Sequence, residues 1–532
     1  MDNNRTIIAV VLVVLLWSGY SLFFAPQVPI QQAPPVETVT KENLPKEEVK
    51  QIDAAVDSSA SDTLSNLNEK ESFTTISSPY YDIKISSIGA TIRSIVLKKY
   101  RETNAVDSPF FNLLDSDSFT LSTLKIAGSD GLYLPANLNY KVLDSKSSIE
   151  LKNENVTVSF VATINDLTVI KNYTFNPSLY AFDLDVQLIN NSDKIVTGRL
   201  NLLLTTAWDK GDKSQMYTFV GPVTFNGEDL EEDKAADLEK SPKIYKDNIV
   251  WSGYTSKYFL SVVNPGEKQE QLFISAGDGF VENKFTSPGI SLIKDQKTSF
   301  TYSAYFGPKQ DEYLVASGHQ YEKAINYGFF HPLSKPLMVV LKFFYSYIGN
   351  FGFSIILLTI CIKLIFWPLT QKSYKSMQGM QNLQPEMKKM REKYGKDKKK
   401  LNQEMMSFYK DNKVNPLGGC LPMLIQIPVF FALYRVLLGS IELMHAPFIL
   451  WITDLSAKDP YYVTPLIMGV TMFLQQKMTP TNMDPTQAKI MLMMPVVFTF
   501  MFLNFPSGLV LYWLTNNLLT ILQQYLIKRQ NV

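Results

Sequence analysis

The feature that most constrains this chain is an apolar run of twenty residues, 351–370, which contains a single cation, Lys363. A helix rises about 1.5 Å per residue, so the run is long enough to cross a bilayer core of about 30 Å. Lys363 would then lie roughly 10 Å from the nearer end. An ionisable group at that depth costs about 2.5 to 3.5 kcal/mol and usually faces a polar cavity or an ion path. Alternatively its long side chain snorkels to the nearer interface, and both interpretations are open.

Charge divides the chain into two unlike parts. From His331 onward it holds 21 Lys or Arg against 9 Asp or Glu, whereas the first 330 residues hold 30 against 41. Of the 19 methionines, 17 lie at or beyond Met338. Both cysteines, Cys361 and Cys420, lie in apolar runs of the second part. The long polar part therefore has no disulfide framework and must fold on its own core.

The first part predicts an anchor, a tether and a β domain. Residues 1–24 are apolar after Arg5 and have no A-x-A site before Ala25, which favours an uncleaved transmembrane anchor over a signal peptide. Residues 25–72 are rich in Pro, Gln, Glu, Lys and Ser, which predicts a disordered linker. Residues 73–313 alternate polar and apolar positions in short runs separated by turn residues, which predicts an all-β sandwich.

The second part predicts a polytopic α-helical membrane region. Residues 314–350 are expected to connect the β domain to the membrane region. A connecting helix is predicted at 311–327, overlapping the end of the β domain, and it is followed by an amphipathic helix in the membrane interface. This second helix could instead pack on the β domain. With the anchor and 351–370, four further apolar segments make six predicted transmembrane helices. These segments are residues 417–438, 461–476, 490–504 and 507–527.

The charged loops predict the topology. Residues 371–416 carry 12 Lys or Arg against 5 acidic residues, so they are expected in the cytoplasm, with both termini there and the β domain outside. The same segment predicts an antiparallel helical hairpin with a methionine stripe and a basic tip. Either the stripe holds the hairpin together, or it offers an adaptable contact surface. The basic tip is either solvated or contacts ribosomal RNA or anionic lipid. The candidate hairpin contacts are Met377, Met380, Met387, Met390, Lys398, Lys399 and Lys400.

Polar residues inside the predicted spans suggest a wet concavity on the cytoplasmic side. Thr359 and Lys363 are four residues apart and share one helix face, while Gln426 and Asn516 belong to other spans. The alternative for the amides is hydrogen bonding between helices. The three histidines are scattered, and the chain has no phosphate-binding loop, no H-E-x-x-H and no paired cysteine ligands. No cofactor and no metal are therefore expected, although a hydrolase built on Asp or on Ser and Lys stays open.

Four runs carry a specific resemblance: FSIILLTICIKLIFWPLT, NPLGGCLPMLIQIPVFFALY, DPYYVTPLIMGVTMFLQQKMTP and FPSGLVLYWLTNNLLTILQQ. They closely resemble the YidC family of membrane protein insertases. The resemblance implies a periplasmic β-supersandwich and a monomeric core of five helices around a positively charged hydrophilic groove. It also implies nascent membrane proteins as substrates, cooperation with the Sec translocon, and a place in the bacterial inner membrane.

The resemblance also assigns candidate residues. Lys363 stands where the family usually has its groove arginine, and Trp513 where a second tyrosine is frequent. Substrate contacts of the family map onto Thr359, Lys363, Tyr512 and Trp513. The arginine guanidinium is planar and can bind both oxygens of a carboxylate, whereas the lysine ammonium is a point charge. Whether this site binds a carboxylate through two hydrogen bonds is therefore in question.

The predicted function is therefore insertion and folding of inner-membrane proteins, with an acidic outer segment received near Lys363. One alternative is a secondary transporter or channel that uses Lys363 as a substrate or ion site, although no internal repeat supports it. Another is an anchored enzyme that binds or processes sugars, suggested by the β sandwich.

Overall fold

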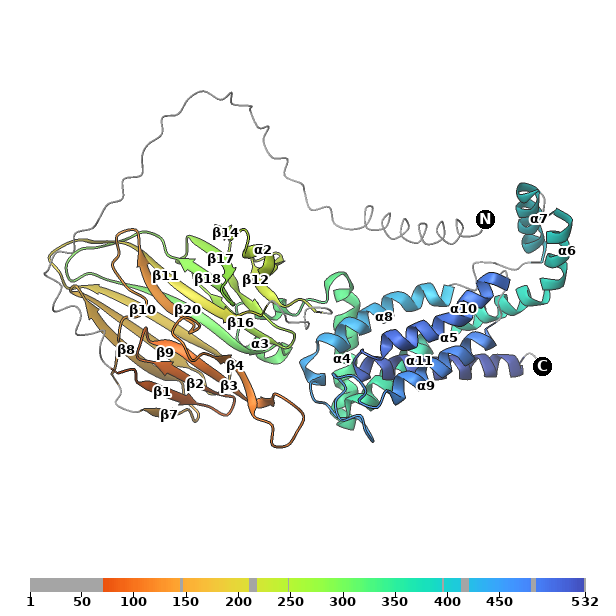
Figure 1. Cartoon of the computed structure of the whole chain (residues 1–532), viewed down its shortest axis with the longest axis horizontal. Helices are drawn as coiled ribbons and strands as arrows, with labels where there is room; N and C mark the ends of the chain where they lie inside the picture. Colours follow the sequence, from red (N-terminus) through yellow and green to blue (C-terminus); the bar gives the residue numbers. More distant parts are fainter. Residues whose placement is uncertain are drawn as a thin grey trace, which may run out of the picture. The chain divides into compact units, whose positions relative to one another are not determined.

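The computed structural model describes residues 70–143, 147–209, 218–246, 248–394, 397–412, 421–479 and 485–530. The predicted anchor at 1–24 and nearly all of the predicted linker at 25–72 lie outside the described residues, as does the side chain of Lys398. The described chain begins with a large β region and continues into a helical region (Figure 1). This division confirms the predicted order of a β domain followed by helices.

Three sheets form the β region. The first has the order β4 (Phe110–Asp115), β3 (Thr91–Arg101), β2 (Tyr81–Ser86), β1 (Phe73–Ser77) and β7 (Ser148–Glu150). The second has the order β13 (Leu230–Glu232), β12 (Gly221–Phe225), β15 (Trp251–Thr255), β16 (Phe259–Asn264), β20 (Lys297–Pro308), β10 (Ala181–Asn190), β9 (Leu167–Phe175), β8 (Val156–Ile164) and β6 (Lys141–Val142). The third has the order β14 (Lys243–Tyr245), β17 (Gln271–Gly277), β18 (Phe280–Thr286), β11 (Val196–Ala207) and β19 (Ile290–Leu292), with β5 (Lys125–Ser129) paired to β11.

Alternation along the strands places one apolar core between the sheets. In β9, every second residue from Leu167 to Phe175 is buried, as expected where side chains alternate between the two faces of a strand. Buried residues from all three sheets belong to a single cluster, for example Ile83, Phe160 and Phe285. The short helix α2 (Ala235–Leu238) lies inside the acidic segment after β13.

The connection between the two regions differs from the continuous helix expected over 311–327. It consists of α3 (Asp311–Ala316) followed by two short 3₁₀ turns, η3 (Tyr321–Ala324) and η4 (Gly328–Phe330). The backbone reason is a run of three residues with positive φ, Gly318, His319 and Gln320. A right-handed helix cannot continue through left-handed residues, and glycine supplies the first of them at low cost.

The next helix, α4 (His331–Ile348), is amphipathic. Met338 and Leu341 are buried, and α4 packs on the helices α5 (Phe351–Asn382) and α8 (Leu421–Gly439). Val339, Phe343 and Tyr347 are exposed on it. An exposed apolar helix face of this kind is what a membrane interface would cover.

The remaining helices are α6 (Gln384–Tyr394), α7 (Lys398–Asp411), α9 (Val463–Met478), α10 (Pro485–Phe502) and α11 (Ser507–Gln530), with the short turn η6 (Ile441–Leu443) after α8. Among the described residues, α5 alone is both long and apolar enough to cross a membrane on length and composition, and Gln426–Gly439 and Met491–Phe502 are shorter apolar helices. The count of six spans therefore stays a prediction.

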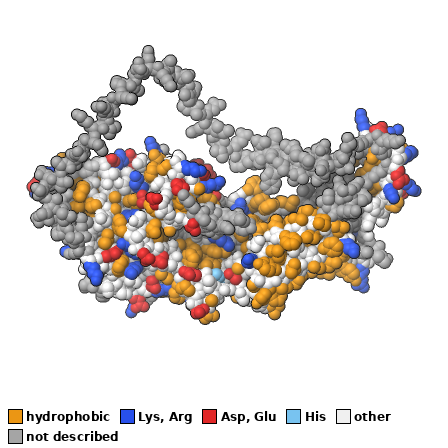
Figure 2. All heavy atoms as spheres, viewed as in Figure 1, with side chains coloured by type: hydrophobic (Ala, Val, Ile, Leu, Met, Phe, Trp, Pro, Cys, Tyr) orange, Lys and Arg blue, Asp and Glu red, His pale blue; other side chains and the backbone are white. Residues whose placement is uncertain are grey.

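Apolar side chains gather on the outside of the helical region (Figure 2). Leu364 and Ile365 of α5, Val470 of α9 and Phe500 of α10 are each at least 60% exposed. Soluble surfaces rarely carry so many adjacent large apolar groups, so this part of the chain suits a lipid environment.

Specific contacts join the β region to the helices. Lys342 of α4 pairs with Glu312 of α3 at 3.1 Å and with Glu442 of η6 at 2.7 Å. Although burial alone lowers the pKa of Lys342, the carboxylates of Glu442 and Glu312 outweigh burial and raise the pKa overall. Ile441 of η6 is buried within the core cluster of the β region. The junction is thus both charged and apolar.

Candidate functional site

Lys363 lies in the seam between α5 and α11. Its Nζ donates a hydrogen bond of 2.8 Å to Oγ1 of Thr520, and that hydroxyl donates in turn to the backbone oxygen of Asn516 at 2.6 Å. Thr520 is buried, whereas Lys363 is half-buried. The ammonium group therefore has a fixed neutral acceptor, and the lysine residue as a whole is partly exposed.

The helices around Lys363 carry no carboxylate. No Asp or Glu occurs in the sequences of α5, α8, α9, α10 or α11. A cation that is removed from water is usually stabilised by an opposite charge, and these five helices supply none. The seam can consequently attract an acidic group that comes from outside them.

Two polar rows on α11 extend the seam. Asn516, Thr520 and Gln523 follow a spacing of four and three residues, and Gln523 Nε2 donates to Oγ1 of Thr370 in α5 at 2.7 Å. Asn517 and Gln524 are seven residues apart and form the second row. Thr520, Gln523 and Gln524 were not among the residues predicted from the sequence, although polar residues three, four or seven positions apart indicate a polar face on an apolar helix.

The second row connects α11 to two neighbouring helices, α5 and α9. Asn517 Nδ2 donates to Oγ1 of Thr471 in α9 at 3.4 Å. Gln524 Nε2 donates to Oη of Tyr374 in α5 at 2.8 Å and to Oγ1 of Thr479, just after α9, at 3.1 Å. These bonds match the alternative raised from the sequence, in which intramembrane amides join helices.

The structure places Gln426 and Tyr512 together. Gln426 Nε2 of α8 donates to the Tyr512 hydroxyl of α11 at 2.6 Å, and Tyr512 is almost fully buried. Trp513 points elsewhere, since its ring packs against Phe430, Phe498 and Phe502. Tyr512 thus forms a hydrogen bond to α8, whereas the adjacent Trp513 packs in an aromatic cluster between α8 and α10.

Thr359 lies one turn before Lys363 and is buried. Its Oγ1 donates to the backbone oxygen of Ile355 at 2.6 Å, so its proton is used within α5. Asn516 is half-buried and takes part through its backbone oxygen. Only Lys363 and Asn516 of the predicted groove residues therefore meet directly around Thr520.

The hairpin residues lie beyond the end of the apolar run. Met377 and Met380 are on the extended end of α5, Met387 and Met390 are on α6, and the first three of these are buried. The hydroxyl of Tyr409 in α7 contacts the sulfur of Met387 at 3.8 Å. Of the four methionines, Met387 therefore packs against the second helix of the hairpin, α7.

The basic tip forms the first turn of α7. Asp397 caps this helix by accepting hydrogen bonds of 3.1 Å from the backbone N–H groups of Lys399 and Lys400. Both lysine side chains are exposed. Positive side chains at a helix N-terminus are unfavourable for the helix dipole, and an anionic partner would relieve that repulsion.

Across the part of the chain that the structure describes, no cluster of three or more His, Cys, Asp or Glu side chains could hold a metal ion.

Comparisons with known proteins agree over the whole length. The family model described as "60Kd inner membrane protein" matches residues 343–532, and that described as "YidC periplasmic domain" matches residues 74–340. "Membrane protein insertase YidC" of Geobacter sulfurreducens is 43% identical over 531 residues, covering 99% of this chain and 98% of that protein. The protein of the same name from Syntrophus aciditrophicus is 46% identical over 475 residues, covering 87% and 86%.

Among solved structures, an active YidC insertase with its first transmembrane domain resolved is 18% identical, with a TM-score of 0.35, and covers 87% of this chain and 95% of that chain. The family matches identify an inner-membrane protein with a periplasmic domain. They do not favour the transporter or channel considered from the sequence. The resemblance seen in the four sequence runs is thereby confirmed: this chain belongs to the YidC family of membrane protein insertases.

Proposed function

We propose that the chain inserts nascent proteins into the inner membrane and helps them fold, with the seam between α5 and α11 as the place where an incoming polar segment is received. The observation that carries this proposal is Lys363, a half-buried cation bonded to Thr520 and surrounded by helices without a single carboxylate. An acidic side chain of a substrate would supply the missing counter-charge.

The polar rows of α11 would lower the cost of bringing a polar segment into this region. An unpaired polar group costs roughly 2 to 7 kcal/mol when it leaves water, depending on the reference state. Amide and hydroxyl groups such as those of Asn516, Gln523 and Thr520 can exchange partners with an entering backbone. We infer that the positively charged hydrophilic groove implied by the family resemblance is built on this seam.

The apolar segment of the substrate would follow the outer surface into lipid. Leu364 and Ile365 of α5 and Leu518 and Leu522 of α11 are exposed beside the polar seam. Burial of apolar surface yields about 25 cal/mol per Å², so transfer of a span of about 20 residues can drive the step without a nucleotide. A membrane potential would add about 2.3 kcal/mol per 100 mV for each acidic charge that moves outward.

The membrane arrangement belongs to the same proposal. Six spans, five of them in the core, would place both termini in the cytoplasm, and the excess of Lys and Arg in residues 371–416 supports this topology. The partners would be nascent membrane proteins, lipids and the Sec translocon, with the core acting as a monomer. The exposed Lys399 and Lys400 would offer a contact to the ribosome.

Removing residues 30–310 is expected to leave insertion largely intact. The proposed seam lies wholly in the helices, and the cut retains Glu312, which pairs with Lys342 in the full-length chain. Insertion of a single-span acidic substrate into liposomes would be compared for the truncated and full-length proteins. Complete loss of insertion by a correctly folded truncated protein would favour a function located in the β region, such as the anchored enzyme.

A further inference from the structure

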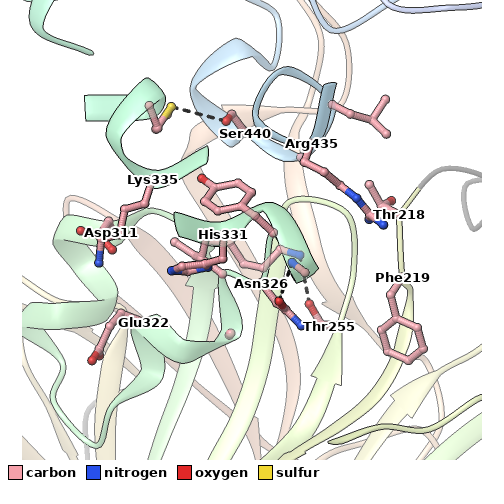
Figure 3. Close-up of a pocket in the computed structure, with 18 of the residues that line it drawn as sticks. Thr218, Phe219, Thr255, Asp311, Glu322, Asn326, His331, Lys335, Arg435 and Ser440 are labelled. Atoms are coloured by element: carbon pink, nitrogen blue, oxygen red, sulfur yellow. Dashed lines mark hydrogen bonds between the residues drawn. The ribbon is translucent and has the colours of Figure 1, made fainter. Parts of the chain in front are cut away.

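A pocket of about 360 Å³ lies where the β region meets α4 and the end of α8 (Figure 3). Its walls come from the strands around β12 and β15, from the connection after β20, from α4, and from the last turns of α8. The volume falls within the range of small-molecule sites. It lies away from the seam between α5 and α11, and its use would be independent of Lys363.

Several cations face this pocket without an acidic partner. Lys257, Lys309, Lys335 and Arg435 line it, and none of them forms an ion pair with any described residue. Lys309 Nζ donates to Oγ1 of Thr255 at 3.1 Å. Burial lowers the pKa of Lys309 to about 8, against the opposing effect of a nearby carboxylate, so it remains mainly charged at neutral pH.

Carboxylates line the same pocket. Glu232 of β13, Asp311 of α3 and Glu322 of η3 face it, and within the described ranges none of the three is in an ion pair. Burial raises the pKa of Glu232, opposed by a hydrogen bond from Asn326 and by the charges of Lys309 and Arg435. Opposite charges therefore line one cavity without neutralising each other by direct contact.

Lys335 and Arg435 come from the helical wall of the pocket, whereas Lys257 and Lys309 share the β-region wall with Glu232. Lys335 and Arg435 belong to α4 and α8, the two helices of the membrane region that reach the pocket. In Figure 3, Arg435 extends from α8 toward Thr218, while Lys335 and His331 come from α4. Glu232 and Glu322 belong to the β region and its connection. A ligand with separated positive and negative groups would match this arrangement better than a simple anion.

The pocket also borders the surface that suits lipid. Val339 of α4 lines the pocket and is 61% exposed, and Phe343, one turn further along α4, is 54% exposed. An amphipathic helix with this face lies at the boundary of head groups and acyl chains. Met338 and Leu438 add apolar wall. In a membrane whose interface covers this face of α4, phospholipid head groups would lie beside the pocket.

We propose that this pocket binds the head group of a zwitterionic phospholipid that carries a primary ammonium, a phosphoethanolamine group. Arg435 and Lys335 hold its phosphodiester, since guanidinium and ammonium groups form strong charge-assisted hydrogen bonds with phosphate oxygens. Glu232 and Glu322 accept hydrogen bonds from its ammonium. The site would tie the β region to the bilayer surface beside α4.

Photocrosslinking of the full-length protein in vesicles tests this proposal. Phe219, which lines the pocket, is replaced by a photoreactive phenylalanine analogue, and labelled phosphatidylethanolamine, phosphatidylcholine or phosphatidylglycerol is supplied in matched vesicles. We expect phosphatidylethanolamine to be labelled most. Loss of a charged hydrogen bond costs about 1.5 to 3 kcal/mol, so the double variant Lys335→Gln with Arg435→Gln should lower its labelling by about tenfold or more.

Two further variants sharpen the test. Glu232→Gln should reduce the preference for phosphatidylethanolamine over phosphatidylcholine, because phosphatidylcholine has no N–H to donate. Lys323→Gln is the matched control, since Lys323 is an exposed cation of the same connection that does not line the pocket, and it should change nothing.

Four results would overturn the proposal. Labelling of phosphatidylglycerol as strong as that of phosphatidylethanolamine would indicate a site for any anion, and suppression of labelling by free inorganic phosphate would indicate a soluble ligand. The third result is a loss of labelling in Lys323→Gln as large as in the double variant. The fourth is a crosslink to a polypeptide substrate instead of a lipid.

Discussion

Lys363→Glu is expected to reduce insertion of a substrate with an acidic outer segment by at least about tenfold. Two unit charges about 4 Å apart interact by about 4 kcal/mol at an effective dielectric constant of 20, and about 1.4 kcal/mol corresponds to a factor of ten. Reversal of the charge turns this attraction into repulsion. Among the described side chains of the five core helices, Lys363 is the cation that is hydrogen-bonded to Thr520, so its replacement leaves no positive charge at this hydroxyl.

A series at this position separates charge from shape. Lys363→Arg keeps the charge and should retain most insertion, whereas Lys363→Met keeps the length and should give an intermediate loss. Thr520→Val removes the acceptor of the 2.8 Å hydrogen bond but leaves the cation, so a loss of only about twofold to fivefold is expected, in line with a net hydrogen-bond contribution of about 0.5 to 1.5 kcal/mol. Insertion is measured with purified protein in liposomes.

The controls concern both protein and substrate. Lys477→Glu reverses an exposed cation at the end of α9 and should insert normally. A substrate whose outer segment is neutral should be insensitive to Lys363→Glu. If Lys363→Glu inserts the acidic substrate as well as the unmodified protein does, the charged seam has no role in insertion.

Lys171→Met is expected to destabilise the β region by about 3 to 5 kcal/mol, because it leaves buried carbonyl oxygens without their donor, at a cost of about 1 to 3 kcal/mol each. Lys171 is fully buried in β9. Its Nζ donates to the backbone oxygens of Gly89, Ala90 and Leu124 at 3.0, 2.7 and 2.8 Å. Burial lowers its pKa, but three acceptors require three N–H groups, which only the ammonium form has.

The three carbonyl groups belong to residues in left-handed conformations, which are strained at Ala90 and Leu124 but not at Gly89. Gly89, Ala90 and Leu124 have φ values of +70, +45 and +58°. Left-handed conformations cost roughly 1 to 2 kcal/mol for residues with a Cβ, and the ammonium offsets this cost by binding the carbonyl oxygens they expose. Of the three, the oxygen of Ala90 keeps a second donor in the Tyr173 hydroxyl, at 2.7 Å.

Hydrogen exchange of the full-length protein would measure the effect. Amides of β8, β9 and β10 should exchange at least about a hundredfold faster in Lys171→Met if they open through global unfolding of the β region. Lys297→Met, at the exposed start of β20, is the matched control and should leave exchange unchanged. Unchanged protection in Lys171→Met would mean that the ammonium group contributes nothing to stability.

Several features followed from sequence because they depend on local periodicity. Alternation of polar and apolar residues predicted the β region, and long apolar runs predicted the helices that follow it. The end of the helix was harder to predict than its presence. The apolar run ends at Thr370, where hydropathy falls, whereas the helix α5 continues to Asn382. A helix ends where its backbone is broken, and residues 371–382 contain no proline.

The partners of the site residues followed only from the tertiary structure. Sequence placed one cation at an unusual depth in an apolar run, identified the family through four runs, and fixed the absence of acidic residues from the core helices. Sequence did not show that Thr520 contacts Lys363, which is 157 positions away. It also did not show that Tyr512, rather than Trp513, bonds Gln426. Nor did it show that the carbonyl groups of three residues in left-handed conformations bind Lys171. Composition and periodicity are properties of a segment, whereas these contacts depend on how helices and strands pack, and packing is decided by the whole folded chain.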